Sequence, residues 1–463
     1  MPINSIRAES ESTRGNAADV LLPRRSEPVT AVDNSTWTPP APRQFDERVD
    51  EWTSILDQLL LPEHVEFVDV RGVCDGYAII KNMQVRGAPL IATVGLLSLL
   101  VELRHQFDAE QFVAGLGASD TVSPSAGGGG EIASIIPILG GTGKTTRATN
   151  IDNERDLVPM AVERFVAYVE AKCTYLVDAR PTAVNLANVV ARLRALLAER
   201  APKMAVARSA ARGAADAIDA ILNLRAVIEQ FVFEWRARER DENNALIRNS
   251  MAALLPRVYH DPACNTAQLV VMTICNTGSL ATSSFGTALG VIVHLHRLGA
   301  LRAAIVLETR PYLQGARLTA YELSTQRVPF VLIADGMAGA AMRTYRVDTV
   351  LVGADQVACN GDTANKIGTY ALAVLARYHR VPFYVVTPFE SINSCMENGE
   401  KIFLEERPAN ELIKFNGTAI SPLDCCVWNP AFDVTPAELI AGLLTERGNF
   451  APADLAAQFS ATR

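Results

Sequence analysis

Residues 268–278 read QLVVMTICNTG, an unbroken apolar and β-branched run that ends in a turn sequence. A short run of this kind, bounded by Asn-Thr-Gly, is typical of a strand buried on both faces. We expect this strand at 268–274 and a helix at 287–298. The stretch therefore predicts the first strand–helix unit of an α/β domain.

The same alternation continues toward the C-terminus. We expect further strands at 303–307, 330–334, 349–352 and 383–387, separated by helices at 315–326, 337–345 and 364–379. Strands and helices in strict alternation predict a parallel sheet with helices on both faces. Residues 246–463 are therefore expected to form a Rossmann-like, doubly wound domain.

Ligands of such sheets bind outside the carboxyl ends of the strands, so the residues after each predicted strand are candidates for a site. These residues are 275–278, 308–310, 335–336 and 353–355. The first strand is not followed by the G-x-G-x-x-G pattern of dinucleotide-binding domains. A dinucleotide is therefore not indicated, while a phosphate-bearing small molecule remains open.

The residues before this domain have a different pattern. Apolar residues recur at spacings of three and four along 191–199 and 210–233, with Arg and Glu on the other faces, which predicts helices. We expect residues 45–245 to form a smaller, mainly helical N-terminal domain. Residues 1–44 are rich in Ser, Pro, Arg and Asn and are expected to form a flexible extension.

A Gly-rich stretch interrupts this helical domain at about 115–153. It contains GGTGKTT at 140–146, which raises the question of a nucleotide-binding P-loop. A P-loop needs glycine at position 138, where this chain has Ile138. We therefore interpret the stretch as an insertion between helices, and we expect neither it nor residues 1–44 to contact a substrate.

Composition narrows the classes of function. The 463 residues include 43 Lys and Arg against 51 Asp and Glu, a formal net charge of −8, which argues against a nucleic-acid partner. No stretch reaches the ~18 apolar residues of a membrane helix. None of the eight cysteines forms a C-x-x-C pair, so a zinc ribbon is not indicated. His294 and His296 lie two apart in a predicted helix and face different sides, so they cannot bind one metal ion together. We therefore expect no metal, no cofactor and a reduced, cytoplasmic protein.

Several separated motifs occur in order along the chain: RGAP at 86–89, CNTGSLA at 275–281, ETRPYLQGARLT at 308–319, DGMAG at 335–339 and VGADQVACNGDTANKIGTY at 352–370. With them the sequence closely resembles the methylthioribose-1-phosphate isomerases, aldose–ketose isomerases of methionine salvage. The resemblance covers about residues 45–445, apart from the Gly-rich insertion. The alpha, beta and delta regulatory subunits of the guanine-nucleotide exchange factor for translation initiation share the fold, so fold alone does not decide function.

The resemblance implies two catalytic residues. In the family a cysteine and an aspartate face each other across the sugar, and the matching positions are Cys275 and Asp355. Asp355 is expected to donate a proton to the ring oxygen of 5-methylthioribose 1-phosphate, after which hydrogen moves from C2 to C1. Such a donor needs a raised pKa, and its neighbours Val352 and Val357 are consistent with an apolar pocket. Cys275 either supports the transition state or shuttles the C2 proton, and a nearby helix start would favour its thiolate. Proton and hydride transfer both remain open.

The resemblance also implies how the sugar phosphate is held. The matching substrate-binding residues are Arg86, Gly87, Ala88, Arg180, Gln314, Asn365 and Lys366. Asn365 and Lys366 are expected to begin the helix at 364–379, whose N-terminus suits an anion. The family is dimeric, so a homodimer through the Rossmann-like half is expected.

One departure and two alternatives accompany this resemblance. The usual Gly-Ala-Asp-Arg of the family ends in Gln356 here, which bears on the rate more than on the reaction type. A non-catalytic exchange-factor subunit typically lacks the Cys/Asp pair that this chain has. A ribose-1,5-bisphosphate isomerase would share the pair but needs additional cationic groups for its second phosphate. The block at 308–317 favours the methylthioribose substrate.

Overall fold

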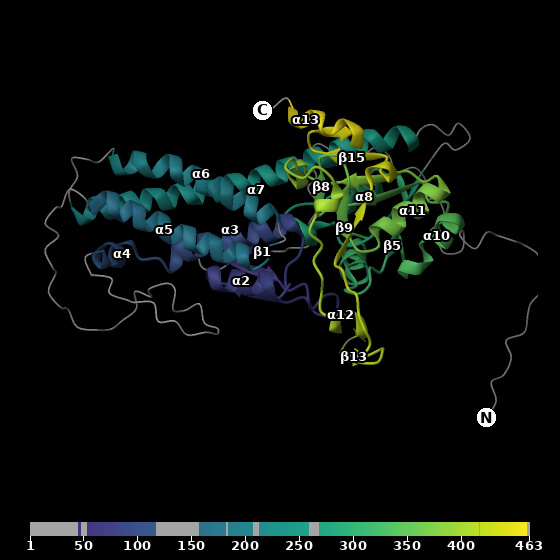
Figure 1. Ribbon diagram of the computed structural model, residues 1–463, viewed down its shortest axis with the longest axis horizontal. Coiled ribbons are helices and arrows are strands. Elements are labelled where there is room, and N and C mark those ends of the chain that lie inside the picture. The colour runs from purple at the N-terminus through teal and green to yellow at the C-terminus, as the bar shows by residue number, and fades with distance from the viewer. Residues whose placement is uncertain are drawn as a thin grey trace, which may run out of the picture. The chain divides into compact units, whose positions relative to one another are not determined.

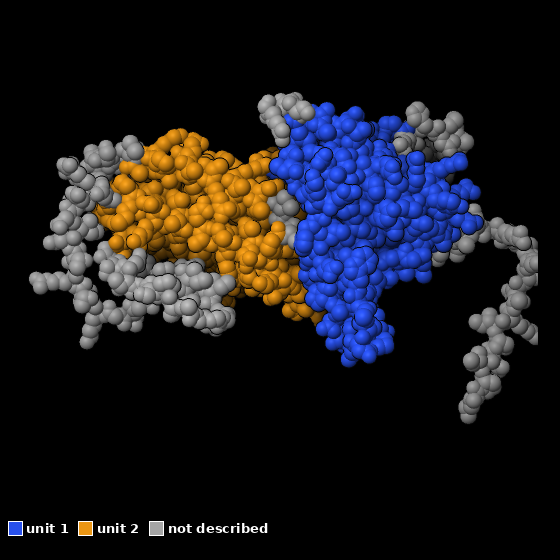
Figure 2. Space-filling view, viewed as in Figure 1, with its two compact units in different colours: residues 1–42, 243–279, 285–463 blue, residues 43–242, 280–284 orange. Residues whose placement is uncertain are grey.

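The computed structural model describes residues 45–47, 53–116, 157–181, 184–206, 213–258, 268–415 and 417–460. The predicted extension at 1–44 and nearly all of the predicted insertion at about 115–153 lie outside these residues. The chain divides into two compact units, drawn in different colours in Figure 2. Unit 1 contains 243–279 and 285–463, and unit 2 contains 43–242 and 280–284.

A seven-stranded sheet forms the centre of unit 1 (Figure 1). Its strands, in spatial order, are β16 (Gly448–Phe450), β15 (Gly442–Thr445), β10 (Phe383–Val386), β7 (Thr349–Val352), β4 (Leu269–Thr273), β5 (Leu301–Leu307) and β6 (Phe330–Ile333). All neighbours are parallel except β15 and β16. The chain runs outward from β4 through β5 to β6, and then returns to β7 on the other side of β4. The strand order therefore reverses between β4 and β7, which is where open α/β sheets bind ligands.

Helices cover both faces of this sheet. Their bounds are α7 Ala214–Val258, α8 Ala288–Arg297, α9 Ala320–Thr325, α10 Ala338–Tyr345 and α11 Thr369–His379. Neighbouring residues of β4 point to opposite faces: Val271 packs with α8, α9 and the end of α7, whereas Met272 packs with α10 and α11. This arrangement confirms the predicted doubly wound α/β class.

A second sheet and a hairpin follow the later strands of unit 1. The second sheet has the order β11 (Ile392–Asn393), β8 (Gln356–Ala358), β9 (Thr363–Lys366) and β14 (Phe432–Thr435). The hairpin β12 (Lys414–Phe415) and β13 (Thr418–Ala419) follows α12 (Asn410–Ile413), and Figure 1 shows this segment extending away from the main sheet. Short helical turns complete the unit: η4 Gly315–Thr319, η5 Asp335–Met337, η6 Phe389–Ser391, η7 Gly399–Lys401, η8 Ala437–Leu439, η9 Pro452–Asp454 and α13 Ala457–Ser460.

The prediction of one helix over 364–379 is wrong at its start. Thr363–Lys366 forms strand β9, which pairs antiparallel with β8 on one side and β14 on the other. Helix α11 begins only at Thr369, after Gly368 adopts a left-handed conformation with φ +100°. Pairing with β14, which lies far along the chain, overrides the local helical pattern.

Unit 2 is built from helices around α3. Its elements are β1 Phe45–Glu47, β2 Thr53–Leu56, β3 Phe67–Val70, α2 Val73–Lys81, α3 Ala88–His105, α4 Ala109–Gly115, α5 Leu157–Asp178, α6 Val184–Val206, η3 Ser279–Ala281 in part, and α7 up to Glu242. Helix α3 is long and apolar enough to cross a membrane, but 78% of it is buried in contact with its neighbours. It is therefore the core helix of this unit. The antiparallel sheet β1-β2-β3 is a feature that the helical pattern did not predict.

Candidate active site

Cys275 lies at the carboxyl end of β4 in a constrained backbone conformation. Its φ is +69°, in the left-handed region that non-glycine residues rarely adopt. The N–H of Cys275 donates to Oγ1 of Thr309 at 2.9 Å, and its carbonyl accepts from Oγ1 of Thr319 at 2.6 Å. Thr309 is itself fixed, because its N–H donates to Oδ1 of Asp335 at 2.8 Å. Hydroxyls from the next strand–helix unit thus hold the backbone of Cys275 on both sides.

Asp355 follows β7, the strand next to β4. Both predicted catalytic residues therefore lie just after the two strands between which the strand order reverses. The two loops are in direct contact: a Cβ on Gly353 would lie 2.7 Å from Cγ2 of Thr277. The N–H of Asp355 donates to the carbonyl of Ala364 at 2.9 Å, which joins its loop to β9. Both Asp355 and Cys275 are half-buried. The strand alternation predicted that both residues follow carboxyl ends, and the strand order brings their two chain segments together.

The loop after Cys275 is anchored at two places. The N–H and the hydroxyl of Ser279 both donate to Oε2 of Glu322, each at 2.7 Å. The following α-helix, α8, begins at Ala288, and the N–H groups of Thr287 and Leu289 donate to the carbonyl and to Oγ1 of Thr277 at 2.7 and 3.0 Å. The start of α8 thus meets the loop two residues after Cys275, and its effect on the Cys275 thiol stays a prediction.

Gln314 is fully enclosed at the carboxyl end of β5. Its side chain is only 4% exposed, and it directly precedes η4. Gly315 permits this close approach, because a Cβ there would lie 1.8 Å from the carbonyl oxygen of Leu307. Within the described part of the chain the buried Oε1 of Gln314 accepts no hydrogen bond. A buried acceptor of this kind needs a donor, such as a hydroxyl group of a bound sugar.

Asn365 and Lys366 belong to strand β9, so the expectation that they begin a helix is wrong. The Nδ2 of Asn365 donates to Oγ1 of Thr369 at 3.0 Å, and the ammonium of Lys366 lies 4.3 Å from the centre of the Phe432 ring. The first amides of α11 do not face an open site, because Gly368 and Tyr370 donate to the carboxylate of Asp433. The cationic group that this segment offers to an anion is the side chain of Lys366.

The other predicted binding residues lie in unit 2. Arg86 is buried, with 6% of its surface exposed, and Ala88 is the first residue of α3. Gly87 adopts φ +83°, and a Cβ there would lie 2.1 Å from the carbonyl oxygen of Ala281. This close contact requires glycine. Arg180 is half-buried and follows the end of α5.

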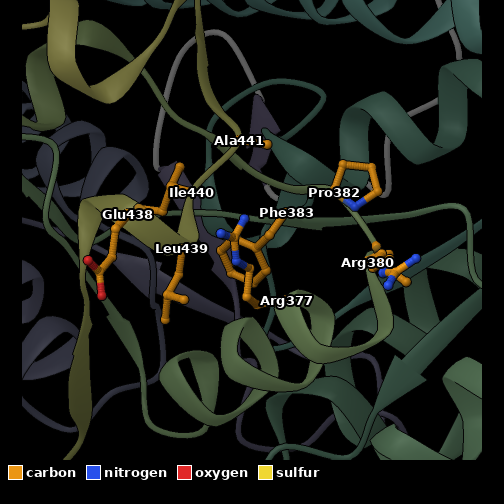
Figure 3. Close-up of a pocket in the computed structure, with 9 residues that line it drawn as sticks. Arg377, Arg380, Pro382, Phe383, Glu438, Leu439, Ile440 and Ala441 are labelled. Atoms are coloured by element: carbon orange, nitrogen blue, oxygen red, sulfur yellow. The ribbon is translucent and has the colours of Figure 1, made fainter.

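A separate cavity of about 620 Å³ lies at the opposite edge of the main sheet, and Figure 3 shows the side chains that line it. Its walls come from the end of α11 and from the residues that precede β10 and β15, among them Arg377, Arg380 and Glu438. These residues lie at the amino ends of the strands, whereas Cys275 and Asp355 follow the carboxyl ends. The cavity is therefore not part of the candidate active site.

Comparison with known proteins shows the family to which the chain belongs. The model of the Initiation factor 2 subunit family matches residues 144–452. The solved delta subunit of translation initiation factor eIF-2B from A. fulgidus is 28% identical, with a TM-score of 0.57 over 88% of this chain and 95% of that one.

Two isomerases match more strongly. Methylthioribose-1-phosphate isomerase of Caenorhabditis elegans is 41% identical over 398 residues, which cover 86% of this chain and 88% of the relative. The crystal structure of 5-methylthioribose 1-phosphate isomerase from Pyrococcus horikoshii OT3 is 29% identical, with a TM-score of 0.66 over 91% of this chain and 95% of that one. The chain therefore belongs to the initiation factor 2 subunit family, in its methylthioribose-1-phosphate isomerase branch.

The structure adds residues that the sequence analysis did not single out. Thr309 and Thr319 hold Cys275, and Asp433 holds the start of α11. Both threonines lie in the motif at 308–319, but the sequence of this motif does not indicate that their hydroxyls bind the backbone of Cys275. These contacts depend on strands that meet only in the folded sheet.

Proposed function

We propose that this protein is an aldose–ketose isomerase that converts 5-methylthioribose 1-phosphate to 5-methylthioribulose 1-phosphate, with Asp355 and Cys275 as its catalytic residues. The main support is the contact between the Cys275 and Asp355 loops, through Thr277 and Gly353, at the point where the strand order of the sheet reverses. The 41% identity of the chain to a methylthioribose-1-phosphate isomerase supports the same function. Sugar phosphates fit this edge of an α/β sheet, because ligands bind outside the carboxyl ends of its strands.

Ring opening is the first chemical requirement. The phosphate on C1 prevents the substrate ring from opening as a free hemiacetal does, so the bond between C1 and the ring oxygen must break. Asp355 donates a proton to that oxygen, which makes it a neutral leaving group. The buried apolar neighbours of Asp355, Val352 and Val357, limit access of water to this step.

Hydrogen transfer from C2 to C1 follows. As a hydride, it leaves C2 with the electron pair and fills the cationic C1, while the C2 hydroxyl loses its proton and becomes the ketone. As a proton, it leaves C2 to give an enol, which is then protonated at C1 while its hydroxyl loses its proton to give the ketone. Cys275 serves the first route as a polar support beside C2 and the second as the group that carries the proton.

Binding of the sugar phosphate is assigned to the residues that match the binding motifs of the family. Lys366 and Asn365 on β9 and the buried amide of Gln314 are three of the proposed contacts. Arg86, the turn at Gly87 and Ala88, and Arg180 are the others. Guanidinium groups and turn amides are suited to phosphate oxygens.

The substrate is tested by comparing two aldose phosphates with the purified chain. We expect turnover of 5-methylthioribose 1-phosphate to exceed that of ribose 1,5-bisphosphate by at least about 100-fold in kcat/KM, since a second phosphate would need its own cationic partners. Preference for the bisphosphate would replace the proposed substrate and leave the reaction type unchanged. Inactivity with both would favour an exchange-factor subunit that does not catalyse.

We also propose a homodimer formed through unit 1. Large apolar side chains are exposed along its segment 403–428, namely Phe403, Phe415, Ile420, Leu423 and Trp428. Exposed apolar groups in this number are typical of surfaces that bind another protein. Light scattering on the purified protein should therefore give twice the chain mass of 50.0 kDa, and a value of one chain mass would contradict the dimer.

A cytoplasmic location is proposed as well. The seven described cysteines are free thiols, and four of them, Cys74, Cys395, Cys425 and Cys426, are exposed. Exposed thiols persist most readily in a reducing compartment. Cell fractionation that recovers the protein with membranes or outside the cell would contradict this assignment.

A further inference from the structure

Asp433, on strand β14, binds the segment that joins β9 to α11. Its Oδ2 accepts from the N–H of Gly368 at 2.7 Å, and its Oδ1 accepts from the N–H of Tyr370 at 3.1 Å. Both carboxylate oxygens therefore accept from the backbone at the start of one helix. The N-cap residue of α11 is Gly368, which has no side chain, so Asp433 supplies the capping acceptor from a strand that lies far away in sequence.

The same strand also contacts the side chains that precede this helix. Asp433 is paired in register with Asn365, and its neighbour Phe432 is paired with Lys366. The ring of Phe432 lies 4.3 Å from the ammonium of Lys366, a distance at which a cation–π attraction acts. Two consecutive residues of β14 thus restrain both proposed phosphate-binding residues of unit 1.

The restrained segment also contacts the strand of Cys275. Gly368 has φ +100°, and a Cβ at this position would lie 3.0 Å from Cδ1 of Ile274, the residue before Cys275. The turn therefore has little freedom to move toward β4. Release of its N–H groups from Asp433 would allow it to move away instead.

We propose that Asp433 is a positioning residue that fixes residues 365–369, and with them the ammonium of Lys366 and the amide of Asn365, in place for the phosphate of the substrate. This inference rests on the proposed function for the identity of the substrate. It does not make Asp433 a catalytic residue, because its oxygens bind backbone amides.

The energetics of Asp433 agree with this role. Burial raises the pKa of its carboxyl to about 6, although the N–H groups of Tyr370 and Gly368 and the charge of Lys366 act in the opposite direction. An ionised carboxylate at this position therefore reduces the stability of the folded state at neutral pH. A carboxylate held at such a cost is what a positioning role requires, because its charge fixes the two N–H groups.

Asp433→Asn tests the proposal, with Asp348→Asn as the matched control. Asp348 is an exposed residue, but desolvation of its carboxyl likewise raises its pKa, and it accepts the N–H of Val270 at 2.7 Å at the amino edge of the sheet. In Asp433→Asn the side-chain amide faces one of the two N–H donors, so one hydrogen bond is lost. Affinity for inorganic phosphate, followed by phosphorus NMR, and the KM and kcat for 5-methylthioribose 1-phosphate are the readouts.

We expect Asp433→Asn to weaken phosphate binding and to raise KM by about 10-fold while kcat stays within about 2-fold, and Asp348→Asn to change neither. Unchanged phosphate affinity in folded Asp433→Asn, or equal losses in both variants, would overturn the proposal. Loss of phosphate affinity in Asp433→Asn without any wild-type turnover would support the positioning role and contradict the proposed function. If Asp433→Asn does not fold, Asp433→Ser provides the same comparison with a smaller acceptor.

Discussion

The backbone N–H of Cys275 donates to Oγ1 of Thr309, and this 2.9 Å hydrogen bond joins the carboxyl ends of the central strands β4 and β5. Both residues have positive φ, +69° for Cys275 and +66° for Thr309. Left-handed backbone at non-glycine residues costs of order 1–3 kcal/mol each and persists only where its surroundings impose it. Two such residues bound to each other at the edge that carries the proposed acid support the proposed site.

Removal of the Thr309 hydroxyl should impair catalysis more than folding. Thr309→Val leaves the N–H of Cys275 without its acceptor, at a cost of about 1–3 kcal/mol in stability. Because the Cys275 backbone then shifts, we expect kcat to fall by at least about 10-fold. Steady-state kinetics and thermal unfolding measure the two effects.

Thr309→Ser is the control for this prediction. Serine keeps Oγ and removes only the methyl group, so kcat should stay within about 3-fold of the wild type, since the hydrogen bond is retained. Equal losses in the serine and valine variants would show that the methyl packing of Thr309, and not its hydroxyl, holds Cys275.

Gly353 should tolerate no side chain, because it is the point where the Cys275 and Asp355 loops touch. A methyl group in Gly353→Ala would lie 2.7 Å from Cγ2 of Thr277 and would push the two loops apart. Overpacking of this kind costs about 1–3 kcal/mol, and we expect a loss of at least about 10-fold in kcat/KM. Gly336→Ala is the matched control, because Gly336 also follows a strand but has open space around its Cα. Equal activity of the two variants would contradict the contact.

The titration of Asp433 predicts a specific dependence of stability on pH. Its pKa in the folded protein is about 6, above the ordinary value of 3.8 expected in the unfolded chain. The stabilisation from protonated Asp433 is therefore fully present at low pH and is lost as the pH rises through 6. Between pH 5 and 7.5 this group should remove about 1 kcal/mol from the free energy of unfolding.

Urea unfolding of the wild type and of Asp433→Asn at pH 5 and at pH 7.5 measures this loss of unfolding free energy. The variant should lack this loss, so its free energy of unfolding should fall by about 1 kcal/mol less than that of the wild type over the same interval. The same pH dependence in both proteins would show that Asp433 is ionised throughout.

Much of the fold could be predicted because its signal is local. The run at 268–274 is apolar throughout, and every residue of β4 is buried, as a central parallel strand requires. Strands were expected before Cys275 and before Asp355, and the geometry of a parallel sheet places both residues at the edge formed by the carboxyl ends of its strands. The adjacency of their two loops followed from the strand order, which the sequence alone does not contain.

The remaining features depend on contacts between distant parts of the chain. Residues 363–366 form a strand because β14 pairs with them, and nothing in Thr-Ala-Asn-Lys indicates that partner. The left-handed backbone of Cys275 likewise depends on hydroxyls from Thr309 and Thr319. Residues 280–284 belong to unit 2 although the predicted domain boundary precedes them, because Ala281 packs against Gly87.

The most direct test of the proposed isomerase function is turnover of 5-methylthioribose 1-phosphate by the purified chain without added metal or nucleotide, followed by phosphorus and carbon NMR. Cys275→Ser and Asp355→Asn are measured alongside, with circular dichroism to verify folding. We predict conversion to the ketose by the wild type and a loss of at least about 1000-fold in both folded variants, since each removes a group that acts on the reacting atoms. Undiminished conversion by either variant would contradict the catalytic role of the residue it replaces. No conversion by the wild type would contradict the proposed isomerase function.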